Sequence, residues 1–198
     1  MEKKVFITNG SAENGKDSFA AFLGKYISVF KYSSIDLVKE MFEFVGVSKN
    51  DKTEKKRKLW SDGKDLLTQY DDIPFKDIAS IVADFKNNKI ETEVLLIDIR
   101  EPDEIARAVA EFGAETILVR NPNVAKIESN HADRDVENYE YDYIIVNNGT
   151  LEQLEATAKN FSDYIKEDSV QTLPNDAYSI INHDGNITMV FESNKMLR

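Results

Sequence analysis

Short apolar runs alternate with amphipathic segments along this chain, and this alternation limits its fold more than any other feature of the sequence. The clearest run is residues 93–98, EVLLID, in which charged residues bracket four consecutive apolar ones. Such a run is typical of a strand that is buried on both faces of a parallel sheet. Similar short runs occupy residues 4–8, 29–32, 116–119 and 143–146. Five such strands between helices predict an α/β protein whose parallel sheet is covered on both faces.

Helical periodicity fills most of the segments between these strands. Ser34 is placed to cap a helix that Gly46 ends, and Pro74 suits the first turn of another helix. The turn Asn147–Thr150 is placed to cap the helix that follows the last of the five strands. The predicted helices cover residues 19–27, 34–45, 51–70, 75–86, 102–112 and 151–165. Gly63 lies inside the third of these segments and weakens its helical pattern.

Two further β-rich runs, 178–182 and 187–191, flank the turn His183–Asn186. Runs joined by a short glycine-containing turn are typical of a hairpin. The polar segment 166–176 would link this hairpin to the preceding helix. We expect the hairpin to be either an edge addition to the sheet or a contact in a homodimer.

The composition excludes several classes of protein. With 198 residues, 41% of them hydrophobic, the chain is long enough for one well-packed domain and too apolar for global disorder. No cysteine is present, which excludes disulfides, thiolate metal sites and a cysteine nucleophile. The net charge of −11 argues against general nucleic-acid binding. No apolar run is long enough to span a bilayer. We therefore expect a soluble cytoplasmic protein with small-molecule ligands, not a partner of nucleic acid or membrane.

One basic cluster interrupts this acidic chain. It consists of Lys52, Lys55, Lys56, Arg57 and Lys58. Such a cluster is either a solvated helix face or one wall of an anion site.

The motif with the clearest chemistry is Gly10–Lys16, which has the spacing GxxxxGK. It directly follows the first predicted strand and directly precedes a helix, as a phosphate-binding loop requires. The loop's backbone N–H groups and the helix N-terminus attract anions, and Lys16 would reach the outer phosphates. The residues expected to bind the phosphates of ATP are Gly10, Ser11, Ala12, Glu13, Asn14, Gly15, Lys16, Asp17 and Ser18. An ordinary glycine-rich turn is the alternative.

Asp17 departs from the usual pattern of this loop, which has Ser or Thr after the lysine to bind Mg²⁺. A carboxylate is also a suitable Mg²⁺ ligand, directly or through water. It adds negative charge beside the phosphates, as Glu13 does inside the loop, and therefore needs a metal ion or a nearby cation. A role as a simple helix cap is the alternative for Asp17.

A second acidic residue, Asp98, ends the strand 93–98. An aspartate at this position in such folds orients Mg²⁺, although it can also simply end a strand. Arg100 follows at the carboxyl edge of the sheet, where ligands of open α/β folds bind.

The polar segment 120–137 lies between two predicted core strands and carries two arginines, Arg120 and Arg134. It is either a plain surface loop or a lid that brings arginines over a transferring phosphate. His131 is either a lid contact or a solvated loop residue.

The pieces of the chain that match a known family are GKDS, IDLVKE after a short strand, DIREPDE, NHADRDVE and YDYIIVNNGTLEQL. Together they resemble the P-loop nucleoside monophosphate kinases. Within that superfamily, residues 3–165 most resemble the phage and bacterial deoxynucleoside monophosphate kinases. The phosphate loop is the most specific of these matches, and the lid is the weakest.

The resemblance implies a P-loop NTPase fold with a five-stranded parallel sheet, and ATP and Mg²⁺ as cofactors. It implies catalytic roles for Lys16, Arg120 and Arg134, and it implies that Asp17 and Asp98 hold the metal. Asp36, Arg57 and Arg100 fall where that family binds the acceptor. The kinase domain would cover residues 1–170, with helical arms at about 34–90 and a lid at about 120–138. The hairpin extension would cover 171–198.

The expected activity is therefore transfer of a phosphoryl group from ATP to a (deoxy)nucleoside monophosphate. Phosphoryl transfer of this kind relies on positioning and charge neutralisation, which suits a chain with two histidines and no cysteine. One alternative is a P-loop kinase for another phosphorylated acceptor, of the dephospho-coenzyme A or phosphomevalonate type. The other alternative is a nucleotide-binding module without catalytic activity.

Overall fold

The structure of this chain is a computed structural model that describes residues 3–50, 53–124, 136–166, 177–181 and 187–192. The chain divides into two compact units. The first unit consists of residues 1–31 and 92–198, and the second consists of residues 32–91.

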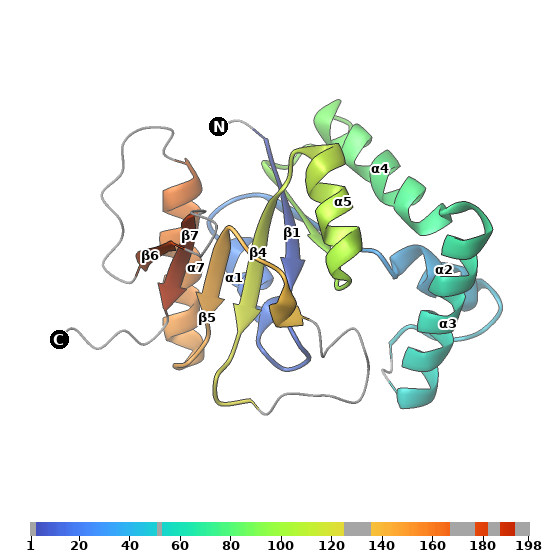
Figure 1. Ribbon diagram of the computed structural model, residues 1–198, viewed down its shortest axis with the longest axis horizontal. Helices are drawn as coiled ribbons and strands as arrows, with labels where there is room; N and C mark the ends of the chain where they lie inside the picture. Colours follow the sequence, from blue (N-terminus) through green and yellow to red (C-terminus); the bar gives the residue numbers. More distant parts are fainter. Residues whose placement is uncertain (1–2, 51–52, 125–135, 167–176, 182–186, 193–198) are drawn as a thin grey trace. The chain divides into compact units, whose positions relative to one another are not determined.

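One seven-stranded sheet organises the fold (Figure 1). Its order is β2-β3-β1-β4-β5-β7-β6. Strand β1 pairs in parallel with β3 and β4, β4 with β5, and β5 with β7, while β6 is antiparallel to β7. The strands are β1 (Lys4–Asn9), β2 (Val29–Ser33), β3 (Val94–Asp98), β4 (Glu115–Arg120), β5 (Tyr143–Val146), β6 (Ala177–Ile181) and β7 (Ile187–Glu192).

This sheet corrects the expected count of five strands. The two strands of the C-terminal hairpin join the same sheet, because β7 lies parallel beside β5. The hairpin is thus an edge addition to the sheet. Its turn, His183–Asn186, lies outside the described residues.

The helices match the predicted segments closely except the first, which was expected at residues 19–27 and is observed at Lys16–Leu23. The first unit contains α1 (Lys16–Leu23), α5 (Pro102–Phe112), α7 (Leu151–Lys166) and the short 3₁₀ helix η1 (Val136–Asn138). The second unit contains α2 (Asp36–Phe44), α3 (Glu54–Asp71) and α4 (Ile73–Lys86).

The main core of the first unit lies between the sheet and two helices, α1 and α7. Its centre is the fully buried Phe161 of α7, whose ring meets those of Phe6, Phe19, Tyr143 and Phe191 edge to face. The centroid distances of these four pairs are 5.2 to 5.8 Å. Edge-to-face packing adds to the free energy gained by burying the rings.

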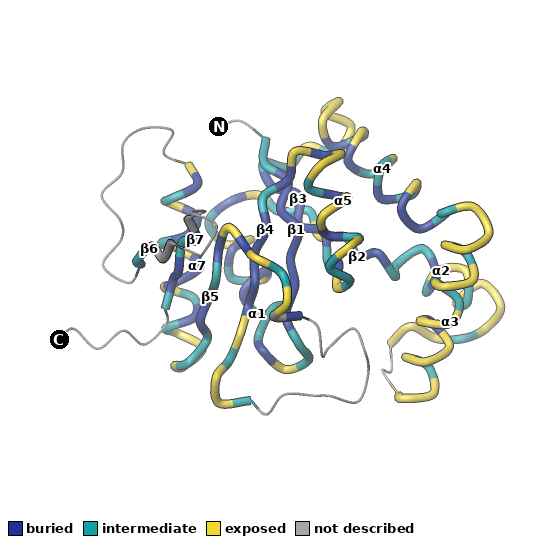
Figure 2. Tube along the Cα trace, viewed as in Figure 1, coloured by how far each residue is buried: buried dark blue, intermediate teal, exposed yellow. Residues whose placement is uncertain are grey.

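The alternate residues of the central strands point to the other face of the sheet, which is also buried. Val5 and Ile7 of β1 lie there, and α5 packs against β1. Ile105, Ala108 and Phe112 form the buried side of α5. The central strands are mostly dark in Figure 2, with paler residues at some of their ends, because helices cover both faces of the sheet.

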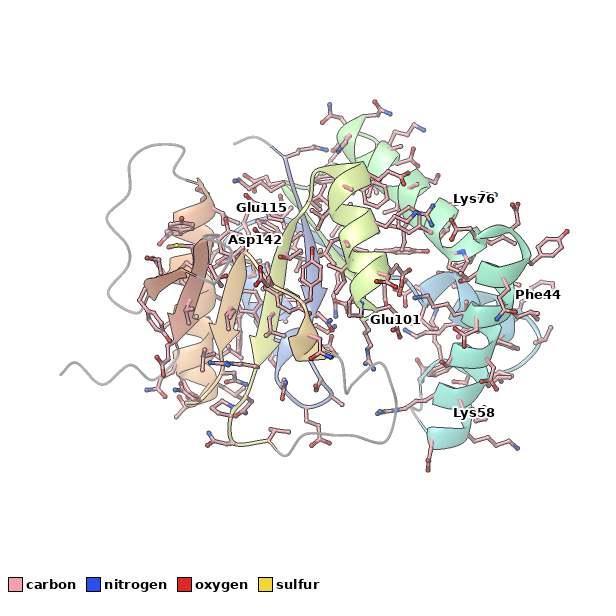
Figure 3. The ribbon with its side chains drawn as sticks, in the orientation of Figure 1. Phe44, Lys58, Lys76, Glu101, Glu115 and Asp142 are labelled. Carbon is pink, nitrogen blue, oxygen red and sulfur yellow. The ribbon has the colours of Figure 1, made fainter. Side chains whose placement is uncertain are left out.

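Acidic residues at the amino ends of β4 and β5 accept hydrogen bonds that link the two strand ends. Asp142 Oδ2 accepts hydrogen bonds from the backbone N–H and the hydroxyl of Thr116, at 2.7 and 2.8 Å. Glu115 Oε2 accepts one of 3.3 Å from the Tyr143 hydroxyl. Glu115 and Asp142 are labelled in Figure 3.

The second unit is helical and has a smaller interior. Trp60 of α3 is buried, and the Lys39 ammonium lies 5.9 Å from its ring centroid. Gly63 lies inside α3 and allows close packing, because a Cβ there would lie 2.7 Å from Cε2 of Phe42. Phe44, labelled in Figure 3, is 93% exposed.

One predicted helix cap is wrong and another is confirmed. Ser34 does not cap α2, whose N-cap is Ile35. The Ser34 hydroxyl instead accepts a 3.1 Å hydrogen bond from the Lys64 ammonium, so it is engaged by a residue of another helix. Thr150 and Gln153 do cap α7: each side chain accepts from the other residue's backbone N–H, at 2.7 and 3.3 Å.

Candidate functional site

The glycine-rich loop of residues 10–15 connects the carboxyl end of β1 to the first turn of α1. Gly15 adopts a left-handed conformation, with φ of 93°, at the N-cap of α1. None of the described side chains caps this helix. The N-cap is therefore Gly15, which corrects the alternative that Asp17 caps α1. Loop N–H groups beside a helix N-terminus form a setting that favours anions.

The positions of Gly10 and Gly15 leave no room for a side chain. A Cβ on Gly10 would lie 2.4 Å from the backbone oxygen of Val119. A Cβ on Gly15 would lie 2.5 Å from Nδ2 of Asn147. The loop therefore lies in close contact with the carboxyl ends of β4 and β5, and a residue with a side chain at either position would displace it.

Lys16 and Asp98 meet directly beside this loop. The Lys16 ammonium donates to Oδ2 of Asp98, and the Thr8 hydroxyl donates to Oδ1 of the same carboxylate. Thr8 and Asp98 are register partners in the paired strands β1 and β3. The side chains of Lys16 and Asp98 are only 16% and 14% exposed. This ion pair is thus largely shielded from water, and its partners are held by two adjacent strands.

A second lysine, Lys31 of β2, joins the same group. Its ammonium donates to Oδ1 of Asp17 and lies 3.1 Å from Oδ2 of Asp98. The Lys16 ammonium lies 3.8 Å from Oδ1 of Asp17. Each of the two lysines therefore contacts both carboxylates. Lys31 belongs to no motif and was not predicted as a site residue. The only signal was a lone cation inside the short apolar strand VFKYS.

The two lysines respond differently to these surroundings. Burial lowers the pKa of Lys16, although Asp98 acts in the opposite direction. Burial alone would also lower the pKa of Lys31, but Asp98 and Asp17 together raise it. The charged form of Lys31 is therefore better stabilised than the charged form of Lys16.

The loop is also braced by hydrogen bonds from neighbouring strands. Oδ1 of Asn9 accepts from the N–H of Gly10, at 2.8 Å. The side-chain amide of Asn9 donates to the carbonyl of Arg100 and the hydroxyl of Tyr141. On the other side, Nδ2 of Asn147 donates to the carbonyl of Asn14, at 3.1 Å. These contacts fix the loop before any ligand binds.

The donor set near the loop suits a hard cation only when a substrate adds ligands. Asp17 and Asp98 share two ammonium partners, so their carboxylates lie close together. No group of three or more His, Cys, Asp or Glu side chains with metal-binding geometry occurs among the described residues. Mg²⁺ in phosphate sites commonly takes one or two carboxylates and completes its shell with water and phosphate oxygens. The two aspartates fit that pattern.

The remaining loop residues lie on the same connection. Ser11, Ala12 and Ser18 are partly buried, and Asn14 is buried. Glu13 is exposed and has a φ of 68°. Its charge therefore faces solvent, which weakens its repulsion of a bound phosphate.

Two predicted arginines lie at the same carboxyl edge of the sheet. Arg100 follows the end of β3 and is exposed. Arg120 is the last residue of β4, is exposed, and is the register partner of Val146. Arg134 and His131 lie outside the described residues, as does most of the predicted lid.

The predicted acceptor residues Asp36 and Arg57 belong to the second unit. Asp36 begins α2 and pairs with Lys39 at 2.8 Å. Arg57 lies in the first turns of α3 and is exposed. Of its basic neighbours, Lys58 pairs with Asp62 at 2.9 Å and Lys56 donates to the carbonyl of Ser48 at 2.8 Å. Lys52 lies outside the described residues.

Comparisons with known proteins give likenesses of structure alone. No protein-family profile matches the chain. No curated protein sequence matches it either. A sugar kinase from Janibacter sp. HTCC2649, in an unliganded structure, has a TM-score of 0.43 at 10% identity over 82% of this chain and 95% of that chain. Thymidylate kinase from Ehrlichia chaffeensis has a TM-score of 0.31 at 10% identity over 84% of this chain and 88% of that chain. Function is therefore inferred from the residues of the site.

The described helices do not include a membrane-spanning segment. None of them has the length and the apolar composition that a bilayer crossing requires.

Proposed function

We propose that this chain is an ATP-dependent kinase that phosphorylates a (deoxy)nucleoside monophosphate by direct in-line transfer. The observation that carries the proposal is the ion pair of Lys16 with Asp98 beside a loop that has room only for glycine at residues 10 and 15. A strand–loop–helix connection of this geometry binds polyphosphates through its backbone N–H groups.

The loop residues would hold the donor phosphates of ATP, and Lys16 would move from Asp98 to the outer phosphates. Asp17 and Asp98 would hold Mg²⁺, which neutralises charge on the donor phosphates. Thr8 and the register of β1 with β3 keep Asp98 in place while Lys16 is engaged elsewhere. In-line transfer needs little more from the protein than this positioning and charge neutralisation.

The choice of acceptor rests on the resemblance of the sequence to nucleoside monophosphate kinases. Asp36 and Arg57 would bind the acceptor, and Arg100 would contact its phosphate. Arg120 and Arg134 would stabilise the transferring phosphoryl group. Arginine suits this task because its planar fork can hold two phosphate oxygens.

The direct test is a coupled assay of ATP conversion to ADP with Mg²⁺ and a panel of acceptors. The panel contains ribo- and deoxyribonucleoside monophosphates, dephospho-coenzyme A and phosphomevalonate. We expect ATP turnover only when a nucleoside monophosphate is present. Turnover with another acceptor would reassign the substrate, and ATP binding without any turnover would favour the non-catalytic module.

Lys16→Met tests the loop itself, and Lys25→Met is the matched control. Lys25 lies in the same unit and is half exposed in a surface pair with Glu155. We expect Lys16→Met to lower turnover by about 10²–10⁴-fold, because it removes a charge that stabilises the transition state. The control should keep full activity.

ATP binding can be tested separately by thermal unfolding. Saturation at a hundredfold excess over Kd should stabilise the fold by about 2.7 kcal/mol. An unchanged Tm at millimolar Mg-ATP would contradict the assignment of a nucleotide loop.

A further inference from the structure

Lys31 has an environment that a simple surface lysine does not have. Its ammonium contacts one oxygen of Asp17 and one oxygen of Asp98, and its side chain is 33% exposed. It comes from β2, whereas the two aspartates come from α1 and from the end of β3. Three separate elements therefore bring these charges together, and all three residues belong to the first unit.

The charges of this group balance only when Lys31 is counted. Asp17 and Asp98 carry two negative charges, and Lys16 supplies one positive charge. Without Lys31, a net negative charge would remain beside a loop shaped for anions. Asp98 is only 14% exposed, so water screens its charge weakly, whereas Asp17 is 68% exposed. Lys31 offsets the remaining negative charge.

Lys31 also touches the two carboxylates that a divalent cation needs. Oδ2 of Asp98 is shared by the ammonium groups of Lys16 and Lys31, and Oδ1 of Asp17 is a hydrogen-bond acceptor of Lys31. A divalent cation that binds these oxygens must replace the ammonium contacts. The two cations therefore compete for the same ligands.

We propose that Lys31 is a built-in counter-cation that holds Asp17 and Asp98 beside the loop when no nucleotide is bound and keeps free divalent cations from binding them. This inference rests on the proposed function only in treating Asp17 and Asp98 as metal ligands. Lys31 is thus a positioning residue, because it keeps the carboxylates together and limits metal binding in the absence of nucleotide.

The test is a titration with Mn²⁺, followed by electron paramagnetic resonance, without nucleotide. It compares wild type with Lys31→Met, Lys31→Arg and the control Lys25→Met. We expect Lys31→Met to bind Mn²⁺ at least tenfold more tightly than wild type. Lys31→Arg and Lys25→Met should bind it like wild type, because the first keeps the charge and the second lies elsewhere. Adding Asp17→Asn to Lys31→Met should remove the gain.

Unchanged or weaker Mn²⁺ binding by Lys31→Met would overturn the proposal, as would a gain that survives Asp17→Asn. Circular dichroism shows whether each variant is folded, and Lys31→Gln provides a second neutral variant if Lys31→Met is not. The experiment contains no ATP and no acceptor, so its result is independent of transfer. A wild-type protein without kinase activity would contradict the proposed function and leave this result standing.

Discussion

The side-chain amide of Asn9 donates a hydrogen bond of 2.8 Å to the hydroxyl oxygen of Tyr141, 132 residues further along the chain. The same hydroxyl donates to the carbonyl of Val136, also at 2.8 Å. Asn9 Oδ1 also accepts a hydrogen bond from the N–H of Gly10, the first residue of the glycine-rich loop. A continuous set of buried hydrogen bonds therefore connects the loop to the start of η1.

Tyr141→Phe should destabilise the protein by about 1–3 kcal/mol, because the Val136 carbonyl loses this buried donor. It should also weaken ATP binding, since Asn9 would be less well held beside the loop. Chemical denaturation and ATP titration measure the two effects. Tyr139→Phe is the control, because its ring packs against that of Tyr141 and it is only half-buried. A loss below about 0.5 kcal/mol in Tyr141→Phe would show that the hydroxyl is not a structural link.

Gly10→Ala should destabilise the protein much more than Gly113→Ala. Both glycines have positive φ, of 155° and 64°. An alanine costs about 1–2 kcal/mol in the left-handed conformation of Gly113 and about 1–3 kcal/mol in the sparsely populated conformation of Gly10. At Gly113 nothing lies within 4 Å of the new Cβ, whereas at Gly10 the backbone oxygen of Val119 lies 2.4 Å away. That overpacking should add about 1–3 kcal/mol. Equal unfolding free energies for the two variants would contradict the close approach of the loop to β4.

Most elements of this fold are predictable from the sequence because their signals are local. The apolar run EVLLID becomes β3, and Pro102–Phe112 forms α5 with the same bounds as predicted. The GxxxxGK spacing likewise places the loop between β1 and α1. Burial on both faces gives the strands their continuous apolar runs, and a helix repeats its apolar face over several turns.

The features that escaped prediction depend on contacts between distant segments. Lys31 reaches the site because β2 is next to β3 in the sheet. The order of strands in a sheet cannot be predicted from local sequence patterns. Ser34 has the residue type of a helix cap, yet Lys64 engages its hydroxyl. The hairpin was predictable as a pair of strands, but the parallel pairing of β7 with β5 was not.

Gly63→Ala should destabilise the second unit even though alanine favours helices by about 1 kcal/mol over glycine. A Cβ at this position would lie 2.7 Å from Cε2 of Phe42 and 3.1 Å from Cγ1 of Val38. Val38 is buried and stiff, so it cannot move away easily. We expect a net loss of about 1 kcal/mol in the free energy of unfolding, measured by urea denaturation.

A double-mutant cycle with Phe42→Leu tests the cause of that loss. The shorter side chain should make Gly63→Ala less harmful by about 0.5–2 kcal/mol, as is usual for residues in contact. Ser61→Ala, at an exposed position of α3, reports the helix preference alone and should be neutral or slightly stabilising. Stabilisation by Gly63→Ala would mean that α2 and α3 pack less closely than described.

Arg120→Ala should lower kcat by about 10²–10⁴-fold if Arg120 stabilises the transferring phosphoryl group. Because the side chain is exposed at the end of β4, the free energy of unfolding should change by less than about 0.5 kcal/mol. Arg107→Ala is the control, since Arg107 lies on α5 and pairs with Glu111 at 3.8 Å. Near wild-type kcat in Arg120→Ala on the best acceptor would exclude this role.

Glu93 makes a contribution to the free energy of unfolding that is lost at acid pH. The Ser28 backbone N–H and hydroxyl both donate to Oε2 of Glu93, at 3.1 and 3.0 Å, and they hold the pKa of this carboxyl below its usual value. A carboxyl with a depressed folded-state pKa stabilises the protein fully above its unfolded pKa, about 4.3 for glutamate. That contribution is lost as pH falls through the folded-state pKa.

Glu93→Gln should therefore destabilise the protein at pH 7 by at most about 1 kcal/mol, because the site is open to solvent. The difference from wild type should shrink as the pH falls from about 4.3, the unfolded-state pKa, through the lower folded-state pKa, at which the wild-type carboxyl takes up a proton in the folded protein. Urea denaturation from pH 3 to pH 7 follows this change. Glu91→Gln is the matched control, because it removes the same charge from an exposed position two residues away. A constant difference between Glu93→Gln and wild type across this range would show that Ser28 does not favour the charged carboxylate.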